Sequence, residues 1–188
     1  MYGGAMSPER LDRDAWVTAG LDALEQRGIE AVAVAALAGS LGVTRGSFYW
    51  HFSSRDELLS GVLEHWERVH SDEVLDALET VTDPRARLKV LLERAVRKPP
   101  SIFVRLLDAA DREPLVAAVL ERSGQRRLDV LTRACREAGM TPAEARRRAL
   151  LCYAAYIGLA RLAGAEGGAV SPRERAAFAR HLTATLVP

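Results

Sequence analysis

The segment that follows Gly42 carries the side chains whose types and spacing suggest chemistry. Residues 41–55 read LGVTRGSFYWHFSSR and contain no Asp or Glu, although the whole chain holds 25 acidic residues. An arginine such as Arg45 can donate two hydrogen bonds to the edge of a guanine base, and hydroxyl, imidazole and guanidinium groups donate to phosphate oxygens. We therefore expect this segment to contact double-stranded DNA through Thr44, Arg45, Gly46, Ser47, Tyr49, Trp50, His51 and Arg55.

Two short helices separated by a glycine turn would position these donors. Apolar residues at helical spacing form one face before the turn: Val34, Leu37, Ala38 and Leu41. Gly42 can take a left-handed conformation without steric cost, Thr44 can cap the second helix with its hydroxyl, and Phe48 can turn inward. This pattern predicts a helix-turn-helix, although an ordinary helical hairpin with a solvated arginine would show the same spacing.

The run from residue 41 to residue 59, LGVTRGSFYWHFSSRDELL, resembles the recognition segment of the TetR family of bacterial transcriptional regulators. In that family a Gly-Val turn leads into a Ser/Thr-Lys/Arg-Gly stretch, an aromatic-Tyr-x-His-Phe run and a Lys/Arg-Glu-Leu-Leu helix start. The resemblance covers residues 10–65. It implies a homodimeric transcriptional repressor that binds a palindromic DNA operator and is released by a small-molecule effector.

Two departures from the family pattern leave a different class of function open. Ala33 stands where a Ser or Thr usually caps the first helix of the motif, and losing such a cap costs about 1 kcal/mol. The first 55 residues also carry nearly equal numbers of arginines and acidic residues. The alternative is a helical bundle that binds a small molecule or a protein and whose DNA contacts have decayed.

Composition indicates a globular protein. The chain has 188 residues, a formal net charge of +1 and 48% hydrophobic residues, which allows a substantial core and argues against DNA binding by bulk charge alone. No apolar run approaches the ~20 residues of a membrane span, and residues 1–6 do not resemble a signal peptide, so we expect a cytoplasmic location. Cys135 and Cys152 lack metal-type spacing, and enzyme motifs are missing from the sequence. We expect no catalytic residue, no metal and no cofactor.

Capping signals divide the chain into about nine helices, so the predicted fold class is all-α. Ser7 is expected to cap the first helix and Gly28 to end it. Ser54 and Glu57 would form a capping box for a long helix that could run to about Leu78. The expected domains are an N-terminal helix-turn-helix DNA-binding domain of three helices, residues 1–53, and a larger helical ligand-binding and dimerisation domain, residues 54–188.

The larger domain shows further start and stop signals. Asp83 precedes one helix, which the prolines at 99–100 would end. Thr141 and Ser171 each open another helix with a Glu three residues later. The helix between residue 114 and about Gly139 has a polar middle with a glycine, where a kink or break is an open alternative.

The resemblance implies a small-molecule site within this larger domain. Its few aromatic side chains and their neighbours are the candidates: Trp66, Phe103, Leu107, Cys152, Tyr153 and Tyr156. Tyr153 and Tyr156, three residues apart on one helix, would supply polar groups on an apolar wall. Ordinary core packing is the alternative for each residue. A bound ligand would act by moving the long helix that begins at Ser54.

Small residues mark one face of the helix that begins after Thr141. The resemblance implies a homodimer through the last two helices, and the candidate contact residues are Ala154, Gly158, Leu162 and Phe178. Tight packing inside one protomer would also explain small residues. We expect a dimer because a single helix-turn-helix reads few base pairs, whereas two read two half-sites.

Overall fold

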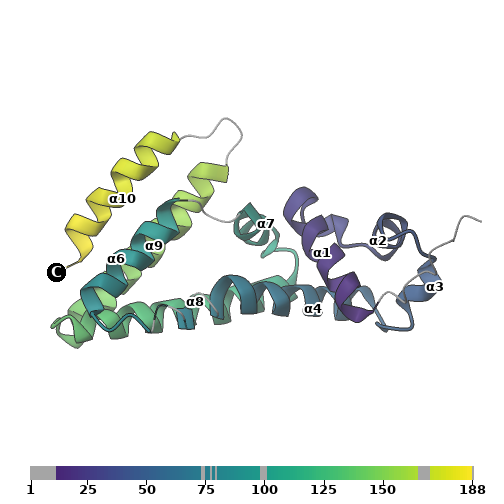
Figure 1. The fold of residues 1–188 in the computed structure, drawn as a ribbon, viewed down its shortest axis with the longest axis horizontal. Helices are drawn as coiled ribbons and strands as arrows, with labels where there is room; N and C mark the ends of the chain where they lie inside the picture. The colour runs from purple at the N-terminus through teal and green to yellow at the C-terminus, as the bar shows by residue number, and fades with distance from the viewer. Residues whose placement is uncertain are drawn as a thin grey trace, which may run out of the picture. The chain divides into compact units, whose positions relative to one another are not determined.

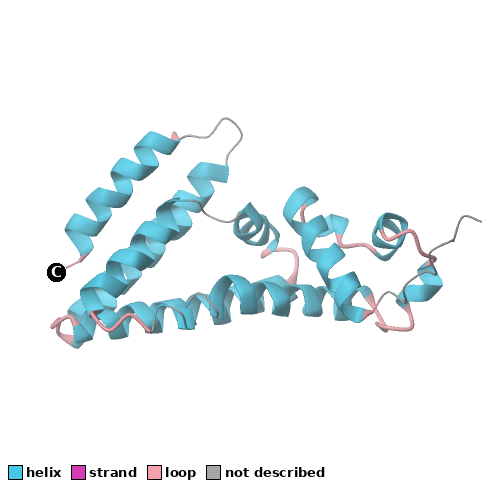
Figure 2. Cartoon of the chain, in the orientation of Figure 1, coloured by secondary structure: helices cyan, strands magenta, loops and turns pink. Residues whose placement is uncertain are grey.

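The computed structural model describes residues 12–72, 75–76, 78, 80–97, 101–164 and 170–187. The described residues contain nine α-helices, a 3₁₀-helix and a π-helix, with no strand among them (Figure 2). The predicted all-α fold class is confirmed. These residues group into two compact units, one ending at Trp66 and one beginning at Glu67 (Figure 1).

The first unit contains the helices α1 (Arg13–Arg27), η1 (Ile29–Ala31), α2 (Val34–Ser40), α3 (Arg45–Phe48) and α4 (Arg55–Glu67), whose last residue belongs to the second unit. The expected start of α1 was wrong. Asp12 is its N-cap and accepts a hydrogen bond from the amide of Ala15 at 2.8 Å, whereas Ser7 lies outside the described residues. Gly28 ends α1 with φ of 88°, as predicted.

Helices α1 and α4 approach each other closely because each has a glycine at the contact. A Cβ on Gly20 would lie 2.6 Å from the Cγ2 atom of Val62, and one on Gly61 would lie 3.3 Å from the Cγ2 atom of Val17. Such distances leave no room for a larger residue at Gly20 without a shift of Val62. The close approach makes α4 part of the first unit's core.

The start of α4 differs in detail from the predicted capping box. Ser54 accepts a hydrogen bond from the amide of Glu57 at 3.2 Å, but the Glu57 carboxylate accepts from the amide and hydroxyl of Ser53 rather than from the amide of Ser54. These bonds hold the pKa of the exposed Glu57 below its ordinary value. α4 ends at Glu67 and continues as the π-helix η2 (Arg68–Asp72). The expected helix to Leu78 is therefore not one uninterrupted α-helix.

The second unit contains α6 (Pro84–Arg97), α7 (Ser101–Ala109), α8 (Pro114–Glu137), α9 (Pro142–Gly164) and α10 (Pro172–Leu186). α8 and α9 form a hairpin around Gly139, whose φ is 99°, and α10 packs along α6 (Figure 1). The core between them includes Leu88, Leu131, Cys152 and Leu182. The predicted helix stop at residues 99–100 lies outside the described residues.

The predicted caps of the second unit are present. Asp83 accepts from the amides of Arg85 and Ala86 at 3.3 and 3.1 Å. Thr141 and Ser171 each exchange hydrogen bonds with the Glu three residues later, which closes two capping boxes.

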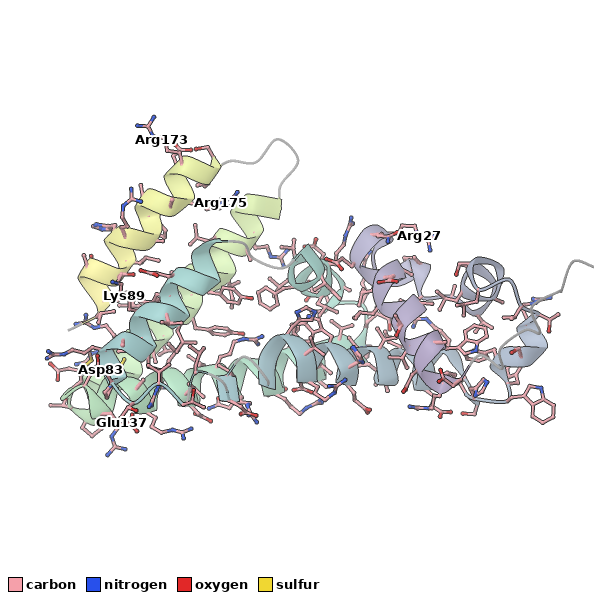
Figure 3. All side chains as sticks on the ribbon, viewed as in Figure 1. Arg27, Asp83, Lys89, Glu137, Arg173 and Arg175 are labelled. Atoms are coloured by element: carbon pink, nitrogen blue, oxygen red, sulfur yellow. The ribbon has the colours of Figure 1, made fainter. Side chains whose placement is uncertain are left out.

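An ion pair joins α6 to the end of α8. The guanidinium of Arg87 donates to the Glu137 carboxylate at 2.8 Å and to the carbonyl of Val81. Figure 3 labels Asp83 and Glu137 at this end of the unit. Because the Arg87 side chain is only 11% exposed, its charge needs these acceptors.

Candidate functional site

The segment between α2 and α3 forms the predicted helix-turn-helix. Gly42 has φ of +68°, and the amide of Val43 reaches back to the carbonyl of Ala38 at 3.0 Å. This closes the end of α2 around a left-handed glycine. Leu37 and Ala38 are buried, as the apolar face predicted.

Thr44 is the N-cap residue of α3, but its hydroxyl does not cap the helix as expected. The amide of Ser47, which would be the capping donor, instead donates to the backbone carbonyl of Thr44 at 3.1 Å. The helix is only one turn long, so this tighter bond replaces the side-chain cap. Ala33 is likewise the N-cap of α2 without a side-chain hydrogen bond, as predicted.

Phe48 anchors α3 in the core of the first unit. Its ring is fully buried, lies edge-on to Trp16 at 5.4 Å between centroids, and stacks on Phe52 at 5.4 Å. Because Phe48 points inward, its neighbours must point elsewhere on this short helix and turn. Tyr49 is 67% exposed and Trp50 is 87% exposed.

The exposed side of α3 and of the turn after it is rich in hydrogen-bond donors. We call this the recognition surface and define it as Thr44, Arg45, Gly46, Ser47, Tyr49, Trp50 and His51, of which Ser47 and His51 are half-buried and the others exposed. It contains no acidic side chain. Seven of the eight residues predicted to contact DNA therefore share one continuous segment.

Arg55, the eighth predicted DNA residue, is held by the protein itself. Its Nε donates to the carbonyl of Val32 at 3.1 Å, its Nη2 to the carbonyl of Ile29 at 3.5 Å, and its Nη1 to the Asp56 carboxylate at 3.5 Å. These bonds tie the first turn of α4 to the segment before α2. The bonds give Arg55 a positioning role, and its predicted phosphate contact stays a prediction.

Three of the predicted ligand residues come together in the second unit. The rings of Phe103 from α7 and Tyr156 from α9 stack with 4.9 Å between centroids and an interplanar angle of 21°. Tyr153 and Tyr156 lie 6.3 Å apart at 27°. The guanidinium carbon of Arg127, from α8, lies 5.7 Å from the centre of the Phe103 ring. We call these four residues the aromatic cluster.

Burial sets the protonation of the aromatic cluster. Desolvation raises the pKa of Tyr156 to about 12 and also raises the pKa of Tyr153, although the charge of Arg127 opposes both shifts. Both phenols therefore stay protonated at neutral pH and can donate hydrogen bonds. Arg127 did not emerge from the sequence, where it stands within a polar stretch of α8.

A glycine of α8 makes room for the cluster. A Cβ on Gly124 would lie 2.7 Å from the Tyr153 hydroxyl oxygen, so α8 and α9 can meet there only because this residue is glycine. α8 runs unbroken through Gly124, which decides the kink-or-break alternative against a break. The glycine serves close packing between helices.

The other three predicted ligand residues are Cys152, Leu107 and Trp66. Cys152 is buried in the core near Cys135, and burial raises its pKa to about 12. Leu107 is half-buried, and its carbonyl accepts from Arg161 at 3.0 Å. Trp66 is buried and is the last residue of the first unit.

An exposed apolar stripe runs along α9. Leu150 is 46% exposed, Leu151 59% and Leu162 46%, and a Cβ on Gly158 would meet no atom within 4 Å. Ala154, between them, is exposed, and so is Phe178 on α10 at 39%. Packing inside the protomer does not explain these small and apolar residues.

The described residues contain neither a metal-binding cluster nor a membrane-spanning helix. No group of three or more His, Cys, Asp or Glu side chains could hold a metal ion in the part of the chain that the structure describes. No helix in that part is both long and apolar enough to cross a membrane.

Part of the chain matches the sequences of bacterial regulatory proteins. Residues 17–62 match the family model for bacterial regulatory proteins of the tetR family. The chain is 35% identical over 72 residues to the HTH-type transcriptional regulator TtgR of Pseudomonas putida, a match that covers 37% of this chain. The match spans 34% of that protein, about a third of its length.

Solved structures share the fold over nearly the whole chain. A transcriptional regulator from Rhodococcus sp. Rha1 superimposes with a TM-score of 0.74 at 22% identity, over 96% of each chain. A protein described as a transcriptional regulator from Saccharomonospora viridis, in complex with choline, superimposes with a TM-score of 0.70 at 19% identity, over 90% of this chain and 93% of that chain. At these identities the likeness shows the fold alone.

Proposed function

We propose that this chain is a transcriptional repressor of the TetR family of bacterial regulatory proteins, which a small-molecule effector releases from its DNA operator. The observation that carries the proposal is the recognition surface, where a buried Phe48 fixes the direction of an exposed, donor-rich segment without acidic residues. Such a protein acts by binding alone, so we propose no catalytic step. We also propose a cytoplasmic location, because that is where bacterial DNA lies.

Arg45 is the proposed base-reading residue. It is exposed on the first turn of α3, and its guanidinium can donate two parallel hydrogen bonds to a guanine in the major groove. Tyr49, Trp50 and His51 follow α3, and we propose that they contact the sugar-phosphate backbone. Gly46 has no side chain to keep the backbone of α3 away from the DNA.

A homodimer would present two recognition surfaces to a palindromic operator. The stripe of exposed apolar residues on α9, together with Phe178 on α10, supports this assembly because a face of that kind loses contact with water when two copies pair. The two recognition surfaces would read two half-sites in successive major grooves, with centres about 34–36 Å apart.

The effector is proposed to act through linkage. A ligand that binds the DNA-incompetent state more tightly by ~1–3 kcal/mol weakens DNA binding, and DNA weakens ligand binding by the same factor. We propose that α4 carries the movement from one unit to the other, because each end of α4 is hydrogen-bonded to a different part of the chain. Arg55 bonds to Val32 and Ile29, and Glu67 accepts from Arg122 at 2.7 Å.

A second candidate is a helical small-molecule or protein binder whose DNA contacts have decayed. The uncapped start of α2 at Ala33 and the internal bonds of Arg55 favour it, since both remove groups that could contact phosphate. The two candidates differ in one measurable property, which is sequence-specific DNA binding.

Selection of bound duplexes from a random DNA pool tests the proposal. We expect enrichment of a palindromic site by the wild-type protein. The Arg45→Ala variant should enrich the same site with one base pair no longer specified, and Tyr49→Ala should enrich the same site more weakly, provided that circular dichroism shows both variants folded. Recovery of no preferred sequence by a folded, dimeric wild-type protein would favour the second candidate.

A further inference from the structure

The aromatic cluster of the second unit is a row of three rings with a positive charge beside it. Phe103, Tyr156 and Tyr153 follow one another at 4.9 and 6.3 Å between centroids, with interplanar angles of 21° and 27°. Three different helices supply the cluster, α7, α8 and α9. Sites between helices of a bundle are common places for small ligands.

Part of the cluster is reachable from solvent. Phe103 is fully buried, whereas Tyr153, Tyr156 and Arg127 are only half-buried. A flat ligand could therefore stack on the tyrosine rings without displacing the core beneath Phe103.

Every polar group of the cluster can donate a hydrogen bond. The guanidinium of Arg127 has five N–H donors and no acceptor. The hydroxyls of Tyr153 and Tyr156 stay protonated at neutral pH because burial raises their pKa values. A ligand that bonds to these groups needs acceptor oxygens, and a negative charge would strengthen each bond.

We infer that the aromatic cluster binds a planar aromatic anion, with its ring on Tyr153 and Tyr156 and its carboxylate or sulfonate oxygens toward Arg127. This rests on the proposed effector-binding function of the second unit. A cationic ligand is disfavoured because the guanidinium of Arg127 already lies over the Phe103 ring, where the new positive charge would be repelled.

Two fluorescent probes that differ only in the anionic group test the inference. These are 8-anilinonaphthalene-1-sulfonate and its uncharged parent, N-phenyl-1-naphthylamine. Wild-type protein at constant ionic strength should bind the sulfonate at least about tenfold more tightly, which is the affinity change expected for a charge-assisted hydrogen bond worth about 1.4 kcal/mol. Arg127→Gln should remove that preference and leave binding of the parent within about twofold.

Arg126→Gln is the matched control. Arg126 is the neighbouring residue on α8, but it pairs with Asp76 at 2.5 Å outside the cluster. Its variant should keep the preference for the sulfonate. The inference is overturned if Arg127→Gln weakens both probes equally, or if Arg126→Gln removes the preference as well.

A competition experiment on the wild-type protein keeps the test decisive if Arg127→Gln fails to fold. Naphthalene-1-sulfonate should displace N-phenyl-1-naphthylamine, and a naphthyl trimethylammonium ion should not. Equal displacement by the cation would contradict the inference. DNA binding by the same preparation is measured separately, so a protein that binds its operator yet shows no anion preference refutes this inference alone.

Discussion

The two units use their aromatic side chains in opposite ways. In the first, Phe48 is buried while its sequence neighbours Tyr49 and Trp50 face solvent at 67% and 87% exposure. In the second, the rings of Phe103 and Tyr156 stack on each other, with Phe103 fully buried and Tyr156 half-buried. A DNA duplex is contacted by an outward-facing surface, whereas a small ligand is bound by a partly enclosed one. The burial of the aromatic side chains, rather than their type, therefore distinguishes the proposed DNA-binding role of the first unit from the proposed ligand-binding role of the second.

The largest expected effect comes from breaking the anchor of the first unit. Phe48→Ala should lower the free energy of unfolding by about 3–5 kcal/mol, because it removes a fully buried ring. Urea denaturation followed by circular dichroism measures this. Trp50→Ala is the matched control, since removing an exposed side chain usually changes stability by less than about 0.5 kcal/mol. Similar losses from both variants would contradict the burial contrast.

The outer face of α9 can be tested by overfilling it. Gly158→Trp should convert dimers to monomers with intact helices, because overpacking a close interface costs about 1–3 kcal/mol. Light scattering at micromolar concentration gives the mass of both proteins. Gly158 is exposed, and a Cβ there would meet no atom of the same chain within 4 Å. A monomeric wild-type protein, or a dimeric variant of unchanged affinity, would remove α9 from the interface.

Gly124 and Gly158 offer a smaller, paired test of the inner face of the same hairpin. Alanine in a helix interior is more stable than glycine by about 0.5–1 kcal/mol, so Gly158→Ala should be neutral or stabilising. Gly124→Ala should lose that gain, because its Cβ would lie 2.7 Å from the Tyr153 hydroxyl. Thermal unfolding at one protein concentration compares them. Equal stabilisation by both would mean that Tyr153 moves aside freely.

Arg55 and Arg45 separate positioning from DNA contact. Arg55→Gln should lower the free energy of unfolding by about 1 kcal/mol through loss of its bonds to the backbone. It should leave the salt dependence of DNA binding unchanged, whereas loss of a phosphate contact lowers the slope of log K against log salt by about 1. DNA titrations at several salt concentrations measure the slope. A decrease near 1 for Arg55→Gln would restore the phosphate role suggested by the sequence.

Local patterns in the sequence predicted the first unit well. Three predicted features depend only on neighbours within a few residues, and the structure has all of them. Gly42 forms a turn with positive φ, Phe48 points inward, and Ala33 gives α2 no side-chain cap. The errors involve competition between nearby donors and acceptors. The backbone carbonyl of Thr44 takes the Ser47 amide that its hydroxyl was expected to bind, and Asp12 rather than Ser7 caps α1.

Long-range contacts could not be predicted from spacing. Arg55 bonds to a carbonyl 23 residues earlier, and Arg127 joins rings that come from two other helices. Helical periodicity shows which face of each helix is apolar but not which helix it meets. The sequence therefore predicted Phe103, Tyr153 and Tyr156 as a set, but missed the arginine that gives their cluster its charge.

The central claim is that the recognition surface reads DNA sequence through Arg45. Fluorescence anisotropy of wild type and Arg45→Ala on the selected duplex, and on duplexes changed at one base pair, tests it most directly. We expect Arg45→Ala to lose ~1–3 kcal/mol on the selected duplex and to lose its preference at one base pair only. An equal loss of affinity on matched and mismatched duplexes would make Arg45 a phosphate contact and would contradict the claim.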